Sequence, residues 1–319
     1  MNETTIQTIL STMQSSLNPE QLSLLDDTLR GLMQPICVSG KTDLLESFLE
    51  AKKVEGCSRK TIAYYESTLT KMIDEIALPP TAITTDDLRK YLAAYEAERG
   101  SSKTTIDNIR RIIASFYAWL EDEDYIVKSP ARRIHHVKQP KRVKGTFTDE
   151  ELEAMREGCE NARDLAIVDL LASTGMRVGE LVALNRNDVN LAERECLVTG
   201  KGDKQRIVYF DARAKLHLQS YLGERSDDCP ALFTTLNGTA NRVSIGAVEL
   251  RLRQLGERTG VQRVHPHKFR RTLATNAIDK GMPIEQVQKL LGHEKIDTTM
   301  HYALVSQSNV KASHRKYLE

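Results

Sequence analysis

Three consecutive runs decide the fold class: Glu195-Cys-Leu-Val-Thr199, then Gly200-Lys-Gly-Asp-Lys204, then Arg206-Ile-Val-Tyr-Phe210. The first and last runs are rich in β-branched and aromatic residues, and the run between them is polar and contains glycine. This pattern is typical of a β-hairpin. On both sides of the hairpin, apolar residues recur at helical spacing instead. We therefore predict a mainly α-helical protein with a small β-hairpin or sheet in its C-terminal domain.

Towards the N-terminus, the spacing of apolar residues between positions 41 and 129 indicates four helices. Ser58, Thr84 and Ser102 stand where three of these helices would begin, and each is a residue type that caps a helix. Four helices of this size can form an independent domain. Between Pro130 and Pro140 the periodicity is lost, which indicates a linker.

These patterns divide the chain into four parts, and each boundary is an expectation. Residues 1–38 form an acidic helical N-terminal extension, and residues 39–129 form a helical domain. Residues 130–145 form a basic linker. Residues 146–319 form a mixed α/β domain that ends in a helix.

The composition excludes several classes of protein. Of the 319 residues 40% are apolar, yet no apolar run approaches the roughly 20 residues that span a bilayer. The N-terminus lacks the basic start of a signal peptide, so we expect a cytoplasmic protein without a membrane partner. The 5 cysteines form no Cys-x-x-Cys pair, so neither a zinc site nor a disulfide framework is expected.

Basic residues cluster in the linker although the net charge is only +1. No acidic residue interrupts the stretch from 128 to 144, and its basic side chains include Arg132, Arg133, Lys138, Lys141 and Arg142. Such a block suits the phosphate backbone of DNA. A solvated linker has the same composition, so charge alone leaves both interpretations open.

A set of polar residues in the C-terminal domain is not explained by helix or strand patterning: Arg177, Lys201, His267, Arg270, His293 and Tyr302. Singly, each fits a surface ion pair, a solvated turn or a packed tyrosine. Together, two guanidiniums can clamp a phosphate, imidazoles and a lysine can move protons, and a tyrosine oxygen can act as a nucleophile. No acidic metal cage accompanies them. The set suits transesterification at a phosphodiester, and we expect no cofactor.

Four motifs in this order resemble the tyrosine recombinases, also called the phage integrase family. The first two are Thr174-Gly-Met-Arg-Val-Gly-Glu-Leu181 and Thr199-Gly-Lys-Gly-Asp-Lys-Gln-Arg206. The others are His265-Pro-His-Lys-Phe-Arg-Arg-Thr-Leu-Ala-Thr275 and Leu290-Leu-Gly-His293, which Thr298-Thr-Met-His-Tyr302 follows. The resemblance covers about residues 41–319 and implies a two-domain DNA clamp. The helical domain resembles the SAM-like core-binding domain of the family, and the last domain its catalytic domain.

The resemblance also implies roles for the residues that match the motifs. Arg177 and Arg270 would hold the scissile phosphate, and His293 would donate a hydrogen bond to it. Glu180 matches an acidic position that supports the site.

Proton transfer and covalent chemistry would fall to the remaining three residues. Tyr302 would attack the phosphate and form a 3′-phosphotyrosyl bond. His267 would assist its deprotonation, and Lys201 would act as general acid toward the leaving 5′ oxygen.

The function implied is site-specific recombination of duplex DNA at specific core sites. The active form would be a homotetramer on DNA, and the protein without DNA would be a monomer or a weak oligomer. In the tetramer, the C-terminal helix after Tyr302 would dock on the adjacent protomer. A second recombinase or an accessory DNA-bending protein is a further possible partner.

Integration and excision of a mobile element is the predicted role. Chromosome dimer resolution, DNA inversion, topoisomerase activity and a non-cutting DNA-binding regulator are the alternatives. The simplest family members have no counterpart of residues 1–38.

Overall fold

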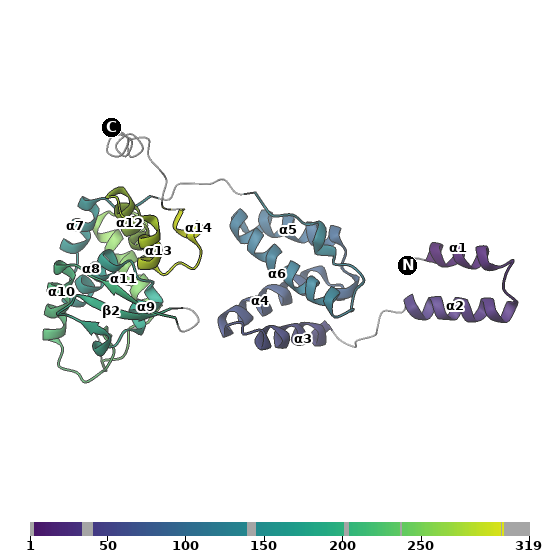
Figure 1. The fold of residues 1–319 in the computed structure, drawn as a ribbon, viewed down its shortest axis with the longest axis horizontal. Helices are drawn as coiled ribbons and strands as arrows, with labels where there is room; N and C mark the ends of the chain where they lie inside the picture. The colour runs from purple at the N-terminus through teal and green to yellow at the C-terminus, as the bar shows by residue number, and fades with distance from the viewer. Residues whose placement is uncertain are drawn as a thin grey trace, which may run out of the picture. The chain divides into compact units, whose positions relative to one another are not determined.

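The computed structural model describes residues 3–33, 41–138, 145–200, 204–236, 238–300 and 302. They fall into two compact units, residues 1–142 and 143–319. Helices dominate these ranges, and the strands within them form a three-stranded antiparallel sheet (Figure 1). The predicted fold class is thereby confirmed. Among the described residues, no helix is both long and apolar enough to cross a membrane.

The first two helices, α1 (Glu3–Met13) and α2 (Pro19–Met33), pack against each other (Figure 1). Before α2, the side-chain oxygen of Asn18 accepts a hydrogen bond from the backbone N–H of Gln21 at 2.8 Å. The Gln21 side chain accepts one from the N–H of Asn18 at 3.1 Å. This reciprocal cap fixes the start of α2. Ile6 is fully buried. This is expected because short helices are stabilised mainly by packing of their apolar face and only weakly by helix propensity.

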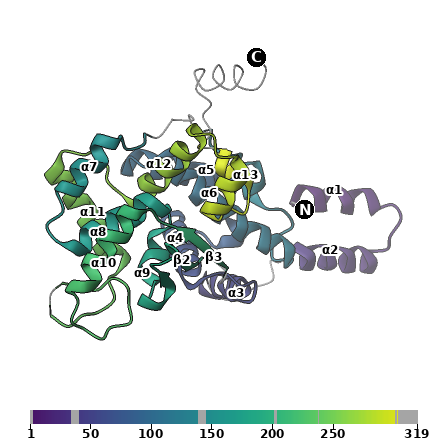
Figure 2. The ribbon, with the colours of Figure 1, turned by 60° about the vertical axis from the view of Figure 1, so that its left-hand side comes forward.

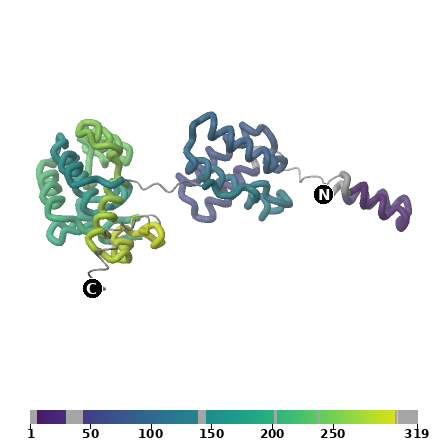
Figure 3. Tube along the Cα trace, turned by 90° about the horizontal axis from the view of Figure 1, so that it is seen from above, coloured from purple at the N-terminus to yellow at the C-terminus, as the bar shows by residue number. Residues whose placement is uncertain are grey.

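Within the first unit, helices α3 (Lys41–Val54), α4 (Arg59–Ile76), α5 (Thr85–Arg99) and α6 (Lys103–Asp122) share one apolar core and form the helical unit. The short 3-10 helix η1 (Pro80–Ala82) lies between α4 and α5. Figure 3 shows these helices as one compact body. The unit is therefore built from the four helices that the apolar pattern indicates.

The caps and the core of this unit follow the sequence pattern. Ser58, Thr84 and Ser102 each accept a hydrogen bond from a backbone N–H in the first turn of the helix they precede. Satisfying these N–H groups places the helix starts at the predicted residues. Phe48 and Phe116 are fully buried and meet edge to face, with ring centroids 5.2 Å apart.

The second unit has the following elements in chain order: α7 (Asp149–Glu157), α8 (Ala162–Thr174), α9 (Val178–Ala183), η3 (Arg186–Asp188), β1 (Val189–Asn190), β2 (Glu195–Thr199), β3 (Gln205–Tyr209), α10 (Ala212–Glu224), α11 (Ile245–Thr259), α12 (Pro266–Asp279), α13 (Ile284–Leu291) and α14 (Ile296–Met300). The buried helix α8 lies between α10 and α12 and contacts both (Figures 1 and 2). The C-terminal helix predicted after Tyr302 lies outside the described residues.

The strands are antiparallel in the order β1-β2-β3. Cys196 pairs with Val208, and Val198 pairs with Arg206. Cys196, Val198 and Val208 are buried, whereas Leu197 between them is partly exposed. Alternation of this kind gives each strand one inward and one outward face. Arg206 therefore stands at an inward position of β3.

Candidate active site

Arg177 stands at the turn between α8 and α9. Gly175 ends α8 with φ +59°, and a Cβ there would lie 2.7 Å from a side-chain carbon of Leu273. This left-handed, crowded position requires glycine. The Arg177 side chain is 40% exposed and donates from Nη1 to Glu180 Oε1 at 2.8 Å. A partly exposed guanidinium fixed by a carboxylate can receive an anion on its free edge.

Arg270 on α12 is only 2% exposed. Its Nη1 donates to the carbonyl of Gly175 at 2.8 Å, and its Nη2 donates to the carbonyl of Leu291 at 2.5 Å. Burial, with the nearby charge of Arg177, lowers the pKa of Arg270 to about 10. The side chain therefore stays cationic at neutral pH, and it joins the turn after α8 to the end of α13.

Glu180 connects Arg177 to Arg206. Its carboxylate is buried, with Oε1 accepting from Nη1 of Arg206 at 2.8 Å and Oε2 accepting from Nη2 at 2.8 Å. The backbone N–H of Arg177 also donates to Oε2 at 2.8 Å. Burial acts to raise the pKa of Glu180, but the hydrogen bonds and charges of the two arginines bring it down to about 2. The carboxylate is therefore ionised at any pH of interest.

His293 and Tyr302 lie next to each other after α13. Gly292 ends α13 with φ +65°, and the rings of His293 and Tyr302 stack with centroids 5.9 Å apart. His293 Nδ1 lies 2.8 Å from the hydroxyl of the buried Thr299. Burial, together with the charges of Arg270, Arg177 and Arg206, lowers the pKa of His293 to about 4. The imidazole is thus neutral at pH 7 and can still donate a hydrogen bond from one nitrogen.

The polar residues predicted from the sequence are brought together to different degrees. Arg270 donates to the carbonyls of Gly175 and Leu291, and Arg177 donates to the carbonyl of Gly292 at the same end of α13. His293 directly follows that end, and Tyr302 stacks on its ring. Tyr302 also packs on a small apolar cluster of α12 and α13. His267 is exposed at the start of α12, three residues before Arg270. Lys201 lies outside the described residues.

Arg206 is the residue of this network that the sequence pattern did not single out. It lies within the second motif, but no role was assigned to it. The available signal was its position in the strand, since alternation places residue 206 on the same face as the apolar Val208. An arginine at an inward strand position needs a buried partner, and Glu180 is that partner.

The basic residues before the second unit are partly described. Pro130–Arg133 form the 3-10 helix η2, which packs against α5 and α6. Arg132, Arg133 and Lys138 are exposed, and Lys141 and Arg142 lie outside the described residues. Asp107 of α6 accepts a hydrogen bond from the backbone N–H of Val137 at 3.1 Å. The segment from 130 to 138 is therefore attached to the helical unit.

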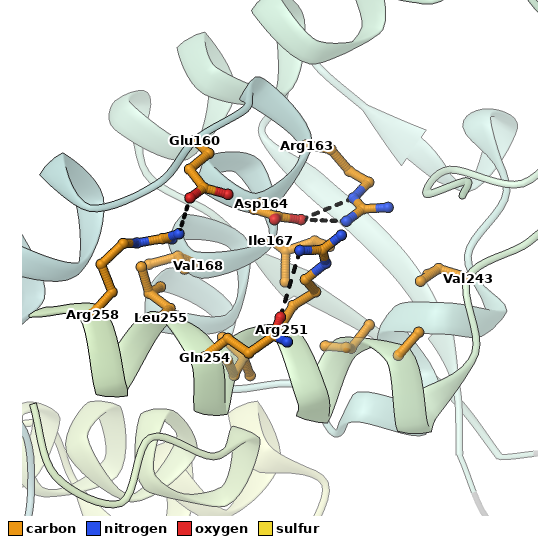
Figure 4. Close-up of a pocket in the computed structure, with 13 residues that line it drawn as sticks. Glu160, Arg163, Asp164, Ile167, Val168, Val243, Arg251, Gln254, Leu255 and Arg258 are labelled. Carbon is orange, nitrogen blue, oxygen red and sulfur yellow. Dashed lines mark hydrogen bonds and ion pairs between the residues drawn. The ribbon is translucent and has the colours of Figure 1, made fainter. Parts of the chain in front are cut away.

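A cavity between α8 and α11 lies apart from these residues (Figure 4). Its apolar wall includes Ile167 and Leu255, and an ion pair of Arg163 with Asp164 lies at its edge. The space of about 20 Å³ has room for roughly one water molecule. Within the described residues there is also no cluster of three His, Cys, Asp or Glu side chains suited to a metal ion.

Comparison with known proteins identifies the family. Residues 145–309 match the phage integrase family, and residues 44–126 match the N-terminal SAM-like domain of phage integrases. The tyrosine recombinase XerC of Oceanobacillus iheyensis is 30% identical over 290 residues, which cover 85% of this chain and 94% of the relative. XerC of Chromobacterium violaceum is 33% identical over 272 residues, which cover 82% of this chain and 89% of the relative.

Solved structures agree on the fold. The XerH site-specific recombinase bound to its palindromic difH substrate has a TM-score of 0.69 at 22% identity and covers 98% of this chain and 95% of its own. The Tn1549 transposon integrase in complex with transposon right end DNA has a TM-score of 0.71 at 16% identity and covers 86% of this chain and 99% of its own. The family match over residues 145–309 and the identities of 30% and 33% to XerC over most of the chain show that it belongs to the phage integrase family, whose members are tyrosine-type site-specific DNA recombinases.

Proposed function

We propose that the chain cuts and rejoins DNA through a covalent 3′-phosphotyrosyl intermediate. The phenolic oxygen of Tyr302 attacks the scissile phosphorus, and the bond from phosphorus to the 5′ oxygen breaks. His267 accepts the phenolic proton, and Lys201 supplies a proton to the leaving 5′ oxygen. In the second step a 5′ hydroxyl of another strand attacks the phosphotyrosine and releases Tyr302. Each phosphoester bond that breaks is therefore replaced by a new phosphoester bond.

The phosphate is held by Arg177 and Arg270, with a hydrogen bond from His293. One observation carries this proposal: both guanidiniums donate to the main-chain carbonyls at the end of α13, next to the stacked pair of His293 and Tyr302. Fixed cations near a phosphate stabilise the charge that develops in the transition state.

The partner is double-stranded DNA that carries specific core sites, on which four copies of the chain assemble. Recombination then takes place between two such sites. In the cell we propose integration and excision of a mobile element. Chromosome dimer resolution and DNA inversion use the same chemistry and differ only in the placement of the sites. Sequencing the DNA that crosslinks to the protein in its host distinguishes these roles, because the orientation and location of the bound sites differ.

The nucleophile is tested with Tyr302→Phe, which removes the attacking oxygen and keeps the ring that stacks on His293. We expect DNA binding at the wild-type level and no covalent protein–DNA adduct on a denaturing gel. The substrate is a half-site with a nick beside the cut, which traps the adduct because the short leaving strand diffuses away. An adduct from the variant at the wild-type level would exclude Tyr302. Binding without an adduct from the wild-type protein would favour a non-cutting regulator.

A further inference from the structure

We propose that Arg206 is a positioning residue that holds Arg177 and His293 in the arrangement that DNA cleavage requires. The inference rests on the proposed roles of those two residues. It assigns Arg206 no contact with DNA, since the side chain is only 15% exposed and its donors already face protein acceptors.

The first argument concerns charge. Glu180 alone would neutralise Arg177, because a carboxylate and a guanidinium in contact carry no net charge. Arg206 contacts both oxygens of the same carboxylate at 2.8 Å, so the group of three side chains carries one positive charge. Arg177 is the exposed member of this group, at 40%. The positive charge therefore remains available for a phosphate beside Arg177.

The second argument concerns the end of α13. Nε of Arg206 donates to the carbonyl of Leu290 at 3.3 Å. A Cβ on Gly292 would lie 2.8 Å from Cδ and 2.9 Å from Nε of Arg206. The arginine thus fills the space against the last turn of α13, directly before His293. Moving Arg206 would remove two hydrogen bonds to Glu180 and the packing against the turn that places His293.

The ordinary alternative is that Arg206 serves only to stabilise the fold. Arg225 provides a matched comparison in the same unit. It is also largely buried, at 4%, and it also donates from two nitrogens to one carboxylate, that of Asp227. Its remaining donors face the carbonyls of Cys229, Ala231 and Leu232, away from the residues of the candidate site. Arg225→Lys therefore reports the effect of losing a bidentate arginine without disturbing Arg177.

The experiment measures the single-turnover rate of adduct formation on the nicked half-site at saturating protein. The variants are Arg206→Lys, Arg225→Lys, Arg177→Lys and the double variant of positions 206 and 177. Half-site affinity and melting temperature are measured alongside. Arg206→Lys keeps the charge but loses the planar fork. We expect the adduct rate to fall on the order of 100-fold, as for a misplaced catalytic group, with unchanged affinity. Arg225→Lys should cleave at the wild-type rate.

The double variant decides whether the effect passes through Arg177. If it does, the loss in the double variant is smaller than the product of the two single losses. A full product, or a wild-type rate for Arg206→Lys, overturns the inference. Arg206→Gln is the second variant, because its amide can still donate to Glu180. If both exchanges at 206 prevent half-site binding while Arg225→Lys does not, Arg206 is a folding residue and the inference is wrong.

The failure of the proposed function is distinguishable in the same assay. If Tyr302→Phe still forms the adduct, the assignment of the nucleophile fails whatever Arg206 does. If Tyr302→Phe is inactive and Arg206→Lys cleaves normally, only the positioning role fails.

Discussion

At the scale of single residues, the arginines of the site keep one buried group ionised and one half-buried group neutral. Glu180 is ionised although it is buried, because Arg177 and Arg206 surround it. His293 is neutral because it is half-buried and lies near the charges of Arg270, Arg177 and Arg206. The two groups therefore respond to acid in different pH ranges. The lowered pKa of Glu180 contributes stability that is lost only as the pH falls from the ordinary value of 4.5 toward about 2.

His293 produces a testable pH dependence of stability. Its pKa falls from 6.5 to about 4 in the folded protein, so between these values the unfolded chain binds more protons than the folded one. Stability must then decrease as the pH is lowered through this window. His293→Asn removes the titrating group. We expect the melting temperature of the variant to fall less steeply than that of the wild type between pH 6.5 and pH 4. Parallel curves for the two proteins would contradict the assigned environment of His293.

At the scale of elements, the helix starts and the β-hairpin could be predicted from local sequence. The capping residues Ser58, Thr84, Ser102 and Thr148 mark helix starts because a cap depends on neighbours three residues away. The hairpin of β2 and β3 follows from alternation and a polar turn. Local sequence fails where the partner is distant.

The contact of Arg206 with Glu180 spans 26 residues, and that of Val137 with Asp107 spans 30. No periodicity encodes such pairs, because each is determined by how helices and strands pack in three dimensions. The chemistry of Arg177, Arg270 and Tyr302 therefore made them candidates from the sequence, whereas Arg206, which contacts Arg177 through Glu180, was not indicated. The attachment of residues 130–138 to the helical unit was missed for the same reason.

Two glycines at helix ends allow a test of how α13 is placed. Gly292 and Gly260 both end a helix with positive φ, +65° and +73°. A Cβ on Gly260 would meet nothing within 4 Å, whereas one on Gly292 would meet Arg206. Alanine at either position adds backbone strain of roughly 1–2 kcal/mol.

We expect Gly260→Ala to lower the free energy of unfolding by that amount and to leave the rate of adduct formation unchanged. Gly292→Ala should lower both the stability, by more than Gly260→Ala, and the cleavage rate. Urea denaturation and the nicked half-site assay measure the two quantities. Equal stability losses and equal cleavage rates for the two variants would show that the contact with Arg206 has no consequence.

At the scale of the whole molecule, the basic residues that precede the second unit are those that we propose to contact the DNA backbone. Arg132 and Arg133 lie on η2, which packs on the helical unit through the buried Ala131. Their backbone is therefore fixed before DNA binds. Ordering a flexible segment on binding costs free energy. A segment that is already fixed avoids this cost, so more of the attraction between its cations and the phosphates contributes to the binding free energy.

Replacing Arg132, Arg133 and Lys138 together with glutamine tests this attraction. All three side chains are exposed, and the pair of Arg132 with Glu121 is long, at 4.0 Å. The melting temperature should therefore stay unchanged, because exposed pairs contribute little. If each side chain binds a phosphate, the plot of log affinity against log salt should flatten by roughly 0.9 for every phosphate that is no longer neutralised. The change should be the same on specific and unrelated DNA, since phosphate contacts carry no sequence information. Lysine at positions 132 and 133 is the control that keeps the charge, and it should preserve the slope. A slope for the glutamine variant equal to that of the wild type would mean that these residues face solvent in the complex.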